Sequence, residues 1–264
     1  MQSYIQTPLI SNENKTVSII IPAYNEEKRI RPVLDEICNY IKSSNLPWNV
    51  IISIDGSDTT DMVVESMRAD FPFLFYVKNG GRNGKGGAIK RAVNIASGEF
   101  IILMDADGSI SLKNIVKAID LTDFYDLIIF DRYSNSENSI PALRRFASRG
   151  FNMLLRATMG IRVNDTQCGY KIMRADYARD AFEKISITNT FFDVALFYYM
   201  KRKGAKSVEI PVEYRHGEDS RFNVMGLVLG IGTSLIAFRI RNSRFYKYVP
   251  GKIIDLYYRK FRWI

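Results

Sequence analysis

Two aspartates that could share one metal ion, Asp105 and Asp107, follow directly on the apolar run 100–104. Such a short run is typical of a buried parallel strand, so the acids stand where that strand would end. Because successive strand side chains point to opposite faces, we expect both carboxylates to point the same way and to hold one divalent ion together with phosphates and water. An Asp-x-Asp pair alone is more often a solvated turn. Its place at the carboxyl end of a strand, where open α/β sheets bind ligands, makes it a candidate site.

Two more polar loops follow predicted buried strands. Residues 17–21 and 50–54 are apolar runs, and each ends in a polar stretch, Pro22–Glu27 and Asp55–Asp58. Loops after the carboxyl ends of parallel strands share one edge of a sheet, so one ligand could touch all three loops. Asp-Gly-Ser alone is a common turn, but the Asp55 carboxylate is also a pure acceptor that could meet the N–H groups of a nucleobase.

A glycine-rich stretch, 79–87, precedes a predicted helix at 88–96. It contains Gly84-Lys85-Gly86-Gly87, which matches neither the Walker pattern nor the spaced Gly-x-Gly-x-x-Gly, so ATPase and dinucleotide-binding functions are disfavoured. A lysine at a helix N-terminus can nevertheless meet a diphosphate. In isolation, a flexible turn explains the stretch equally well.

The elements that must position these residues alternate between strands and helices. Apolar runs predict the strands, and apolar side chains recurring at helical spacing predict the helices between them. This alternation predicts a single α/β unit with a doubly wound, mostly parallel sheet and right-handed crossovers. The predicted strands are 17–21, 50–54, 73–77, 100–104, 126–130 and 207–214, and the predicted helices are 30–44, one from about 60, 88–96, 141–159, 177–184 and 193–203.

The composition is that of a globular protein, with 264 residues of which 47% are hydrophobic. Cys38 and Cys168 lack zinc-type spacing, and we interpret both as reduced thiols in a cytoplasmic protein. The single histidine, His216, argues against a histidine-rich metal site or a Ser-His-Asp triad. Most of the net charge of +9 lies in the tail, because the chain from Arg239 onward holds eight basic residues and one acid.

The C-terminal part of the sequence suggests contact with a membrane. Residues 224–238 carry no charge, but the stretch is short of the ~20 residues that span a bilayer. Flanked by Arg and Lys and followed by mixed aromatic and basic residues, it suits helices lying in the membrane interface. A core helix with a solvated basic end is the alternative. We therefore expect a polar segment 1–16 without signal or anchor, a main domain 17–222, and a membrane-associating region 223–264.

Five motifs, in their order and spacing over about residues 17–247, resemble the inverting glycosyltransferases of family 2. Within that family the chain looks most like the polyprenyl-phosphate hexosyltransferases, the dolichyl-phosphate glucosyl- and mannosyltransferases. On its own, the last motif would be a loop between two helices. The motifs are Ile21–Glu27, Asp55-Gly56-Ser57 with Asp61, Gly84-Lys85-Gly86, Met104–Gly108 and Asp165–Lys171.

The resemblance implies a GT-A fold and assigns roles by position. Asp105 and Asp107 would hold Mg²⁺ or Mn²⁺ on the donor diphosphate. Arg132, Arg144 and Ser148 match positions that hold the lipid phosphate in the mannosyl enzymes. The implied nucleotide-sugar site, with Asp55 on the base, is Pro22, Ala23, Tyr24, Glu26, Asp55, Lys85, Asp105, Ala106 and Asp107, and the implied catalytic set is Asp107, Asp165, Arg132 and Arg144.

Details of the motifs favour the glucosyl branch of this family, which uses UDP-glucose, over the mannosyl branch, which uses GDP-mannose. The Asp-Gly after the strand and the loop Asp165–Gly169 look closer to the glucosyl branch, and the chain has Ser109 where the mannosyl enzymes carry a Gln. Ile54 stands where the family often has a second acid before Asp55, a departure that argues against base recognition by Asp55 and not against either branch. The glucosyl enzymes usually have an N-terminal membrane span that this sequence lacks. Attachment is therefore expected through the C-terminal helices, at the cytoplasmic face of the membrane, as a peripheral or monotopic protein.

The expected reaction is inverting transfer of a hexose, with glucose favoured, to a polyprenyl or dolichyl phosphate. A phosphate monoester has a second pKa near ~6, so it is already anionic and needs no general base. Arginines and a metal ion would offset the repulsion between the two anionic substrates, and Asp165 would orient the sugar or acceptor. A GDP-mannose-dependent enzyme and a noncatalytic nucleotide-sugar or anionic-lipid binding protein are the alternatives. Nucleic acid is not an expected partner, because the basic tail alternates with apolar residues, and the oligomeric state stays open.

Overall fold

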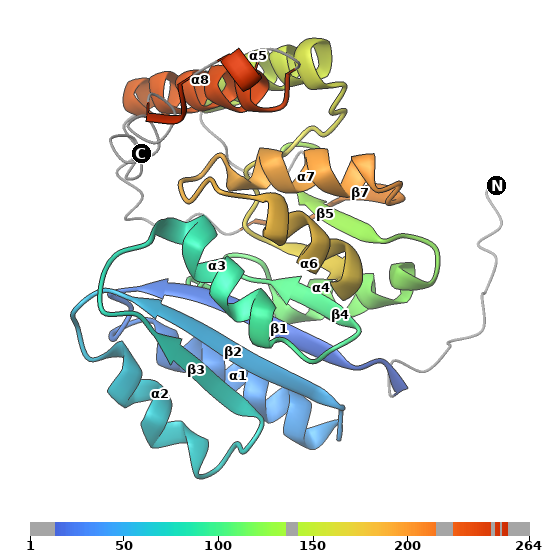
Figure 1. Ribbon diagram of the computed structural model, residues 1–264. Coiled ribbons are helices and arrows are strands. Elements are labelled where there is room, and N and C mark those ends of the chain that lie inside the picture. Colours follow the sequence, from blue (N-terminus) through green and yellow to red (C-terminus); the bar gives the residue numbers. More distant parts are fainter. Residues whose placement is uncertain (1–13, 136–141, 215–223, 244–245, 249, 253–264) are drawn as a thin grey trace, which may run out of the picture.

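The computed structural model describes residues 14–135, 142–214, 224–243, 246–248 and 250–252 (Figure 1). The strands that it describes form one sheet in the order β3-β2-β1-β4-β6-β5-β7. The strands are β1 (Val17–Tyr24), β2 (Trp48–Asp55), β3 (Leu74–Lys78), β4 (Phe100–Leu103), β5 (Leu127–Asp131), β6 (Lys171–Arg174) and β7 (Ser207–Pro211). The helices are α1 (Ile30–Ser43), α2 (Thr60–Arg68), α3 (Gly84–Ile95), α4 (Leu112–Ala118), η2 (Ile119–Asp123), α5 (Ala142–Met159), α6 (Ala175–Lys184), α7 (Phe192–Arg202), α8 (Val224–Arg241) and η3 (Tyr246–Tyr248).

The sheet confirms the predicted doubly wound, mostly parallel architecture. Strand β1 lies between β2 and β4 and pairs with both in parallel, so their carboxyl ends meet at one edge. Strand β6 is the exception, since it pairs antiparallel with β4 and β5. The sequence analysis missed β6 because this short strand begins with Lys171 and ends with Arg174, which conceals its apolar centre.

Alternating side chains of the buried strands feed two separate cores. In β1, Ile19 and Ile21 belong to one apolar cluster and Ile20 belongs to the other. Helices α1, α2 and α4 supply the first cluster, and helices α3, α6 and α7 supply the second, so helices cover both faces of the sheet. Cys38 lies on the inner face of α1 as predicted, and burial raises the pKa of its thiol to about 12.

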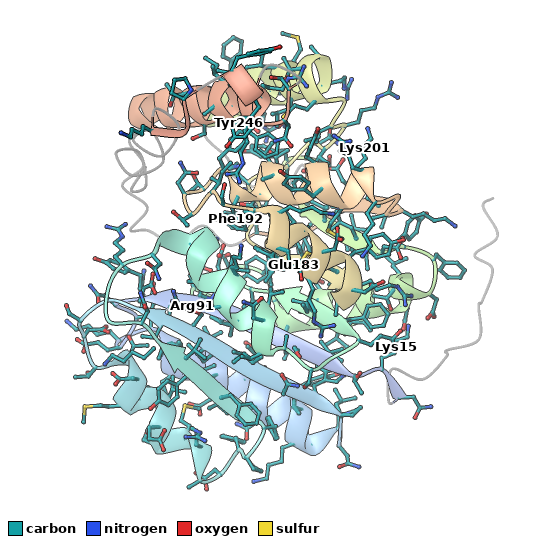
Figure 2. All side chains as sticks on the ribbon, in the orientation of Figure 1. Lys15, Arg91, Glu183, Phe192, Lys201 and Tyr246 are labelled. Atoms are coloured by element: carbon teal, nitrogen blue, oxygen red, sulfur yellow. The ribbon has the colours of Figure 1, made fainter. Side chains whose placement is uncertain are left out.

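Helix α3 begins at Gly84, earlier than the predicted start at residue 88. The backbone N–H of Gly86 donates a hydrogen bond to the carbonyl of Thr188 at 3.0 Å. A Cβ at Gly86 would lie 2.8 Å from Cβ of Phe192, the first residue of α7, which Figure 2 labels. The glycines therefore belong to the first turn of the helix, where they allow α3 to approach the segment from Thr188 to Phe192 closely.

Helix α8 is held against the rest of the protein by its second half. Phe238 packs on Phe191, with ring centroids 5.7 Å apart, and edge-on against Tyr198 of α7 at 5.2 Å. No helix within the described ranges is long and apolar enough to cross a membrane. Residues 1–13 of the predicted polar segment and residues 253–264 of the predicted membrane-associating region lie outside the described residues.

Candidate active site

A cavity of about 370 Å³ lies where β1, β2 and β4 end. It brings together the predicted loops, because every residue predicted to bind the nucleotide sugar lines it. Arg29, Arg82, Gly84 and Ala88 also line it and were missed. The basic and glycine-rich stretch around Arg82 was the signal that could have found three of them. The lining residues are Pro22, Ala23, Tyr24, Glu26, Arg29, Asp55, Arg82, Gly84, Lys85, Ala88, Asp105, Ala106 and Asp107.

The acid pair lies in a turn beyond the strand, because β4 ends at Leu103. The argument from strand alternation therefore does not apply to Asp105 and Asp107, although both line the same cavity. Asp105 is partly buried and Asp107 is exposed. The Asp107 Oδ1 accepts a hydrogen bond from the backbone N–H of Ser109 at 3.0 Å.

Lys85, in the first turn of α3, pairs with Asp105 across the cavity. Its Nζ lies 2.5 Å from Oδ1 of Asp105. Burial alone would raise the pKa of Asp105, but the charge and hydrogen bond of Lys85 outweigh burial and lower it. Burial alone would lower the pKa of Lys85, and the Asp105 charge raises it instead. Both groups are therefore held in their charged forms.

The loop 165–170 packs directly against the acid pair. A Cβ built on Gly169 would lie 1.9 Å from Oδ2 of Asp105, so this position has room for a glycine only. The hydroxyl of buried Tyr170 lies 3.3 Å from Oδ1 of Asp107. Burial, followed by the charge of Asp105, raises the pKa of Tyr170, so its hydroxyl keeps its proton as a donor. The sequence analysis did not assign Tyr170 to the site, although it belongs to the last of the sequence motifs.

The end of the cavity beside β1 offers an aromatic ring and cations. Tyr24 is 46% exposed, and the Arg82 guanidinium lies 4.5 Å from the centre of its ring. Glu26 accepts two hydrogen bonds from Arg29, both at 2.9 Å. Burial raises the pKa of Glu26 even though Arg29 opposes this shift. A planar base could stack on the exposed ring.

Asp55 is the last residue of β2 and is only 3% exposed. Its carboxylate already accepts two hydrogen bonds from the protein. Its Oδ1 accepts from Nη2 of Arg91 at 2.5 Å, and its Oδ2 accepts from the backbone N–H of Asn83 at 2.7 Å. Arg91 belongs to α3 and is labelled in Figure 2. Because a carboxylate has about four lone-pair sites, Asp55 retains capacity to accept a hydrogen bond from a base.

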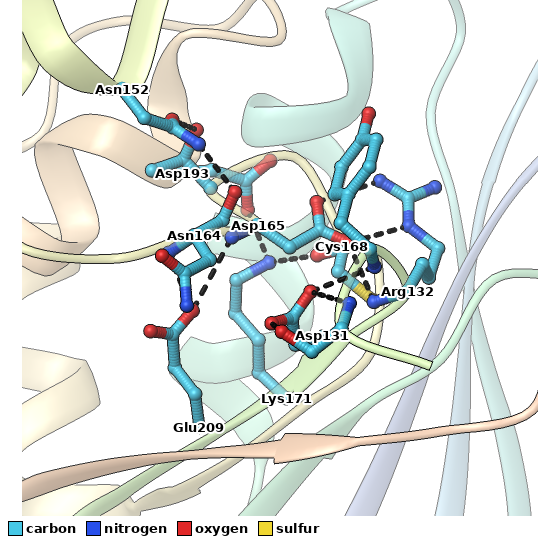
Figure 3. A network of polar contacts seen from close by, with 12 residues as sticks. Asp131, Arg132, Asn152, Asn164, Asp165, Cys168, Lys171, Asp193 and Glu209 are labelled. Atoms are coloured by element: carbon cyan, nitrogen blue, oxygen red, sulfur yellow. Dashed lines mark hydrogen bonds and ion pairs between the residues drawn. The ribbon is translucent and has the colours of Figure 1, made fainter. Parts of the chain in front are cut away.

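Arg132 and Asp165 form a buried bidentate pair (Figure 3). Nε of Arg132 lies 2.7 Å from Oδ2 of Asp165, and Nη2 lies 2.9 Å from Oδ1. The Arg132 side chain is 8% exposed and that of Asp165 is 1% exposed. Burial opposes the charge on Arg132, but Asp165 raises its pKa well above the ordinary value. The structure thus brings together two residues for which the sequence analysis predicted separate roles.

A second buried ion pair, between Lys171 and Asp193, lies beside the same loop (Figure 3). Lys171, fully buried at the start of β6, has its Nζ 2.8 Å from Oδ1 of Asp193 in α7. The same Nζ donates to the carbonyl of Cys168. Burial raises the pKa of the Cys168 thiol to about 12. Lys171 and Asp193 therefore connect the loop between Asp165 and Gly169 to helix α7.

Arg144 and Ser148, the other two residues predicted to hold a lipid phosphate, both belong to α5. Ser148 is partly buried on that helix. The side chain of Arg144 lies outside the described residues. Their predicted role in binding a lipid phosphate stays a prediction.

The acid pair suits a divalent ion that is shared with a substrate. Among the residues that the structure describes, no group of three or more His, Cys, Asp or Glu side chains could hold a metal by itself. Mg²⁺-type ions are often held by one or two carboxylates with substrate phosphates and water completing the shell. Asp105 and Asp107, two carboxyl side chains that line one cavity, fit such a partial site.

Comparisons with known proteins agree with this geometry. Residues 18–182 match the family model described as Glycosyl transferase family 2. The chain belongs to glycosyltransferase family 2. The dolichyl-phosphate beta-glucosyltransferase ALG5A of Trichomonas vaginalis is 30% identical over 236 residues, covering 85% of this chain and 73% of the relative. The dolichyl-phosphate beta-glucosyltransferase of Mus musculus is 28% identical over 248 residues, covering 86% of this chain and 76% of the relative.

Solved structures of more distant glycosyltransferases share the fold. The glucosyl-3-phosphoglycerate synthase of Mycobacterium tuberculosis, in complex with Mn²⁺ and UDP-glucose, matches with a TM-score of 0.62 at 16% identity. The match covers 86% of this family 2 chain and 78% of the synthase. The likeness confirms the predicted GT-A fold.

Proposed function

We propose that this chain transfers glucose from UDP-glucose to a polyprenyl or dolichyl phosphate, with inversion at the anomeric carbon. The observation that carries the proposal is the loop 165–170, which joins two charged sites. At one end Asp165 holds Arg132, and at the other Gly169 packs on Asp105 beside the cavity. One short segment therefore contacts both the cation proposed for the acceptor phosphate, Arg132, and an acid proposed for the donor diphosphate, Asp105. The names of the relatives support the glucosyl donor and the dolichyl acceptor.

The donor would lie in the cavity with its base beside Tyr24 and Asp55 and its diphosphate beside Lys85. Lys85 brings a positive charge to this position on a partly buried side chain, and the Tyr170 hydroxyl donates a hydrogen bond to Oδ1 of Asp107. Mg²⁺ or Mn²⁺ held by Asp105 and Asp107 would offset the charge of the diphosphate as the nucleotide leaves.

The acceptor phosphate would lie near Arg132. Because both oxygens of Asp165 bond to Arg132, Asp165 is better placed to position the guanidinium than to remove a proton. A planar guanidinium has the shape and charge that recognise a phosphate well. Arg144 and Ser148 remain proposed partners of the same phosphate.

The reaction then needs no proton transfer. An oxygen of the anionic acceptor phosphate forms a bond to the anomeric carbon while the bond from that carbon to the β-phosphate oxygen breaks, and the electron pair leaves with UDP. Attack from the face opposite the leaving group inverts the configuration and gives a β-linked product. The work of the protein is to hold and neutralise two anions, which is electrostatic and positional.

We also propose that the enzyme works as a peripheral or monotopic protein on the cytoplasmic face of a membrane. The division into segment 1–16, domain 17–222 and membrane-associating region 223–264 is part of this proposal. The acid-free helix α8 and the basic residues that follow it support attachment through this region.

The experiment is a panel of labelled UDP- and GDP-sugars, incubated with a polyprenyl phosphate and Mg²⁺ or Mn²⁺ and extracted with organic solvent. UDP-glucose should give an organic-soluble product with a β-linkage. Asp107→Asn should reduce this transfer about 100-fold or more, because it removes charge where the donor diphosphate lies. GDP-mannose as the preferred donor would contradict the proposed substrate, and the absence of any lipid product would contradict transfer.

The matched control is Asp70→Asn. Asp70 is exposed just beyond the end of α2, and α2 runs away from the edge of the sheet where the cavity lies. This variant should transfer at the wild-type rate. Equal loss in both variants would show that the defect at Asp107 is not specific to the site.

A further inference from the structure

The outer face of helix α5 is apolar although it is exposed. Phe146 is 78% exposed and Met153 is 72% exposed. Gly150 and Ala157 are exposed at helical spacing from Phe146 and continue the same stripe. Leu155, on the other side of the helix, is fully buried in the core. The stripe therefore points away from the protein, which is the reverse of an ordinary amphipathic surface helix.

Arginine borders this stripe, and α5 contains no acid. The eighteen residues of α5 include four arginines and neither Asp nor Glu. Arg149 and Arg156 are both exposed, and because they are seven residues apart they follow one edge of the stripe. An exposed apolar stripe with a purely cationic border complements an anionic surface that has an apolar interior.

Helix α8 presents the same combination at the same end of the molecule (Figure 1). Ile236 is 62% exposed and Ile240 is 38% exposed one turn later, with Arg239 exposed between them. Leu235 and Phe238 hold the opposite side of this helix in the core. The short η3 that follows adds exposed tyrosines, including Tyr246, which Figure 2 labels beside α8.

We propose that α5 is a membrane-contacting helix, and that its exposed face lies on an anionic lipid bilayer with Phe146 and Met153 among the headgroups. Sequence reasoning placed membrane contact only in residues 223–264, whereas α5 lies in the middle of the chain. The bilayer fits better than a protein partner because both helices lack acids and both expose arginine next to large apolar side chains.

The position of α5 links this surface to the acceptor site. After the end of β5, Arg132 is part of the segment that leads to α5. A helix anchored in the headgroup layer would bring that arginine toward the plane in which the phosphate of a membrane-embedded prenol lies. This last step alone rests on the proposed function.

The test compares two double variants of the full chain in flotation with vesicles of phosphatidylcholine, with and without phosphatidylserine. Phe146→Ser/Met153→Ser should bind the anionic vesicles at least about tenfold more weakly than the wild type, because two apolar anchors are lost. Added salt should weaken wild-type binding, because the arginines act through screened charge. Met62→Ser/Phe124→Ser is the matched control, with residues 67% and 62% exposed away from α5 and α8, and should bind like the wild type.

Unchanged vesicle binding by Phe146→Ser/Met153→Ser would overturn the proposal. An altered oligomeric state of that variant, with vesicle binding intact, would also overturn it and assign the face to a second copy of the chain. Transfer to a short-chain isoprenyl phosphate in detergent, measured in parallel, should be the same in all three proteins. If the wild type made no product while the vesicle results came out as expected, the proposed function would fail and the membrane surface would stand.

Discussion

At the scale of single residues, the charge on Asp105 is maintained by neighbouring groups. Lys85 lies 2.5 Å away and keeps the carboxylate ionised despite its partial burial. Gly169 contributes by lacking a side chain, since any Cβ there would overlap the carboxylate. The acid is thus already charged and oriented before a ligand arrives, which reduces the cost of binding one.

Gly169→Ala should therefore damage the site more than the fold. The new methyl group must displace Asp105 or the loop, and a misplacement of about 1 Å near the reacting groups can cost roughly 100-fold in rate. The measurement is kcat/KM for lipid-product formation, together with the free energy of unfolding. Gly150→Ala is the matched control, because a Cβ there meets nothing within 4 Å, and it should keep full activity. Equal activity of the two variants would contradict the importance of this contact.

Glu209 allows a test by pH. It accepts backbone hydrogen bonds from Asn164 at 2.6 Å and Asp165 at 3.3 Å, and burial raises its pKa. An acid whose pKa is raised on folding binds its proton more tightly in the folded state, so its contribution favours folding at low pH. That contribution is lost as the pH rises from the ordinary value near 4.5 through the raised value.

Glu209→Gln removes this titration while keeping an acceptor oxygen. The free energy of unfolding of the variant, measured in urea at mildly acidic and at neutral pH, should fall less over that interval than that of the wild type. The same pH dependence in both proteins would show that Glu209 is not the titrating group.

At the scale of elements, the ion pair between Lys171 and Asp193 joins β6 to α7 and supports the loop 165–170 from within the core. A buried pair is expensive to form, but removing one partner leaves an unpaired buried charge. Lys171 stands at the start of β6, where its register partner is Leu103 at the end of β4.

Lys171→Met should lower the free energy of unfolding by roughly 3 to 5 kcal/mol, because Asp193 loses its partner. The double variant Lys171→Met/Asp193→Leu should recover most of that loss. Its kcat/KM should stay low if the pair positions the loop, which denaturant titration and product assays measure side by side. Recovery of both stability and activity would show that the ion pair stabilises the fold but does not position the loop.

The sequence predicted the elements whose signal is local. The apolar runs of β1, β2 and β5 indicated buried strands correctly, and the ends of β1 and β2 marked the edge at which the cavity lies. It did not predict β6 or the pairing of Arg132 with Asp165. The strands that pair with β6, and the two members of the ion pair, are distant along the chain, and such contacts leave no periodic pattern in the sequence. The true start of α3 was missed because glycines such as Gly84 and Gly86 are poor helix formers, and it is tertiary packing against α7 that requires a glycine at Gly86.

At the scale of the whole molecule, α8 is part of the folded body as well as of the proposed membrane surface. Phe238 is 2% exposed and contacts rings on and before α7, whereas Ile236 on the same helix is 62% exposed. The helix therefore connects the core of the protein directly to the proposed membrane surface.

Phe238→Ala should cost about 3 to 5 kcal/mol of unfolding free energy, since it empties a filled aromatic site. Ile236→Ala, measured in the same way without lipid, should change it by about 0.5 kcal/mol or less. Similar small losses in both would mean that α8 is not integrated into the core.

The most direct test of the account is calorimetric binding of UDP with and without Mn²⁺. The wild type should bind UDP at least about tenfold more tightly when Mn²⁺ is present, because the diphosphate and the acid pair complete one coordination shell. Asp107→Asn should lose this metal effect, and Asp70→Asn should keep it. UDP binding by the wild type that is indifferent to Mn²⁺, or a full metal effect in Asp107→Asn, would contradict the claim that Asp105 and Asp107 meet the donor diphosphate through a metal ion.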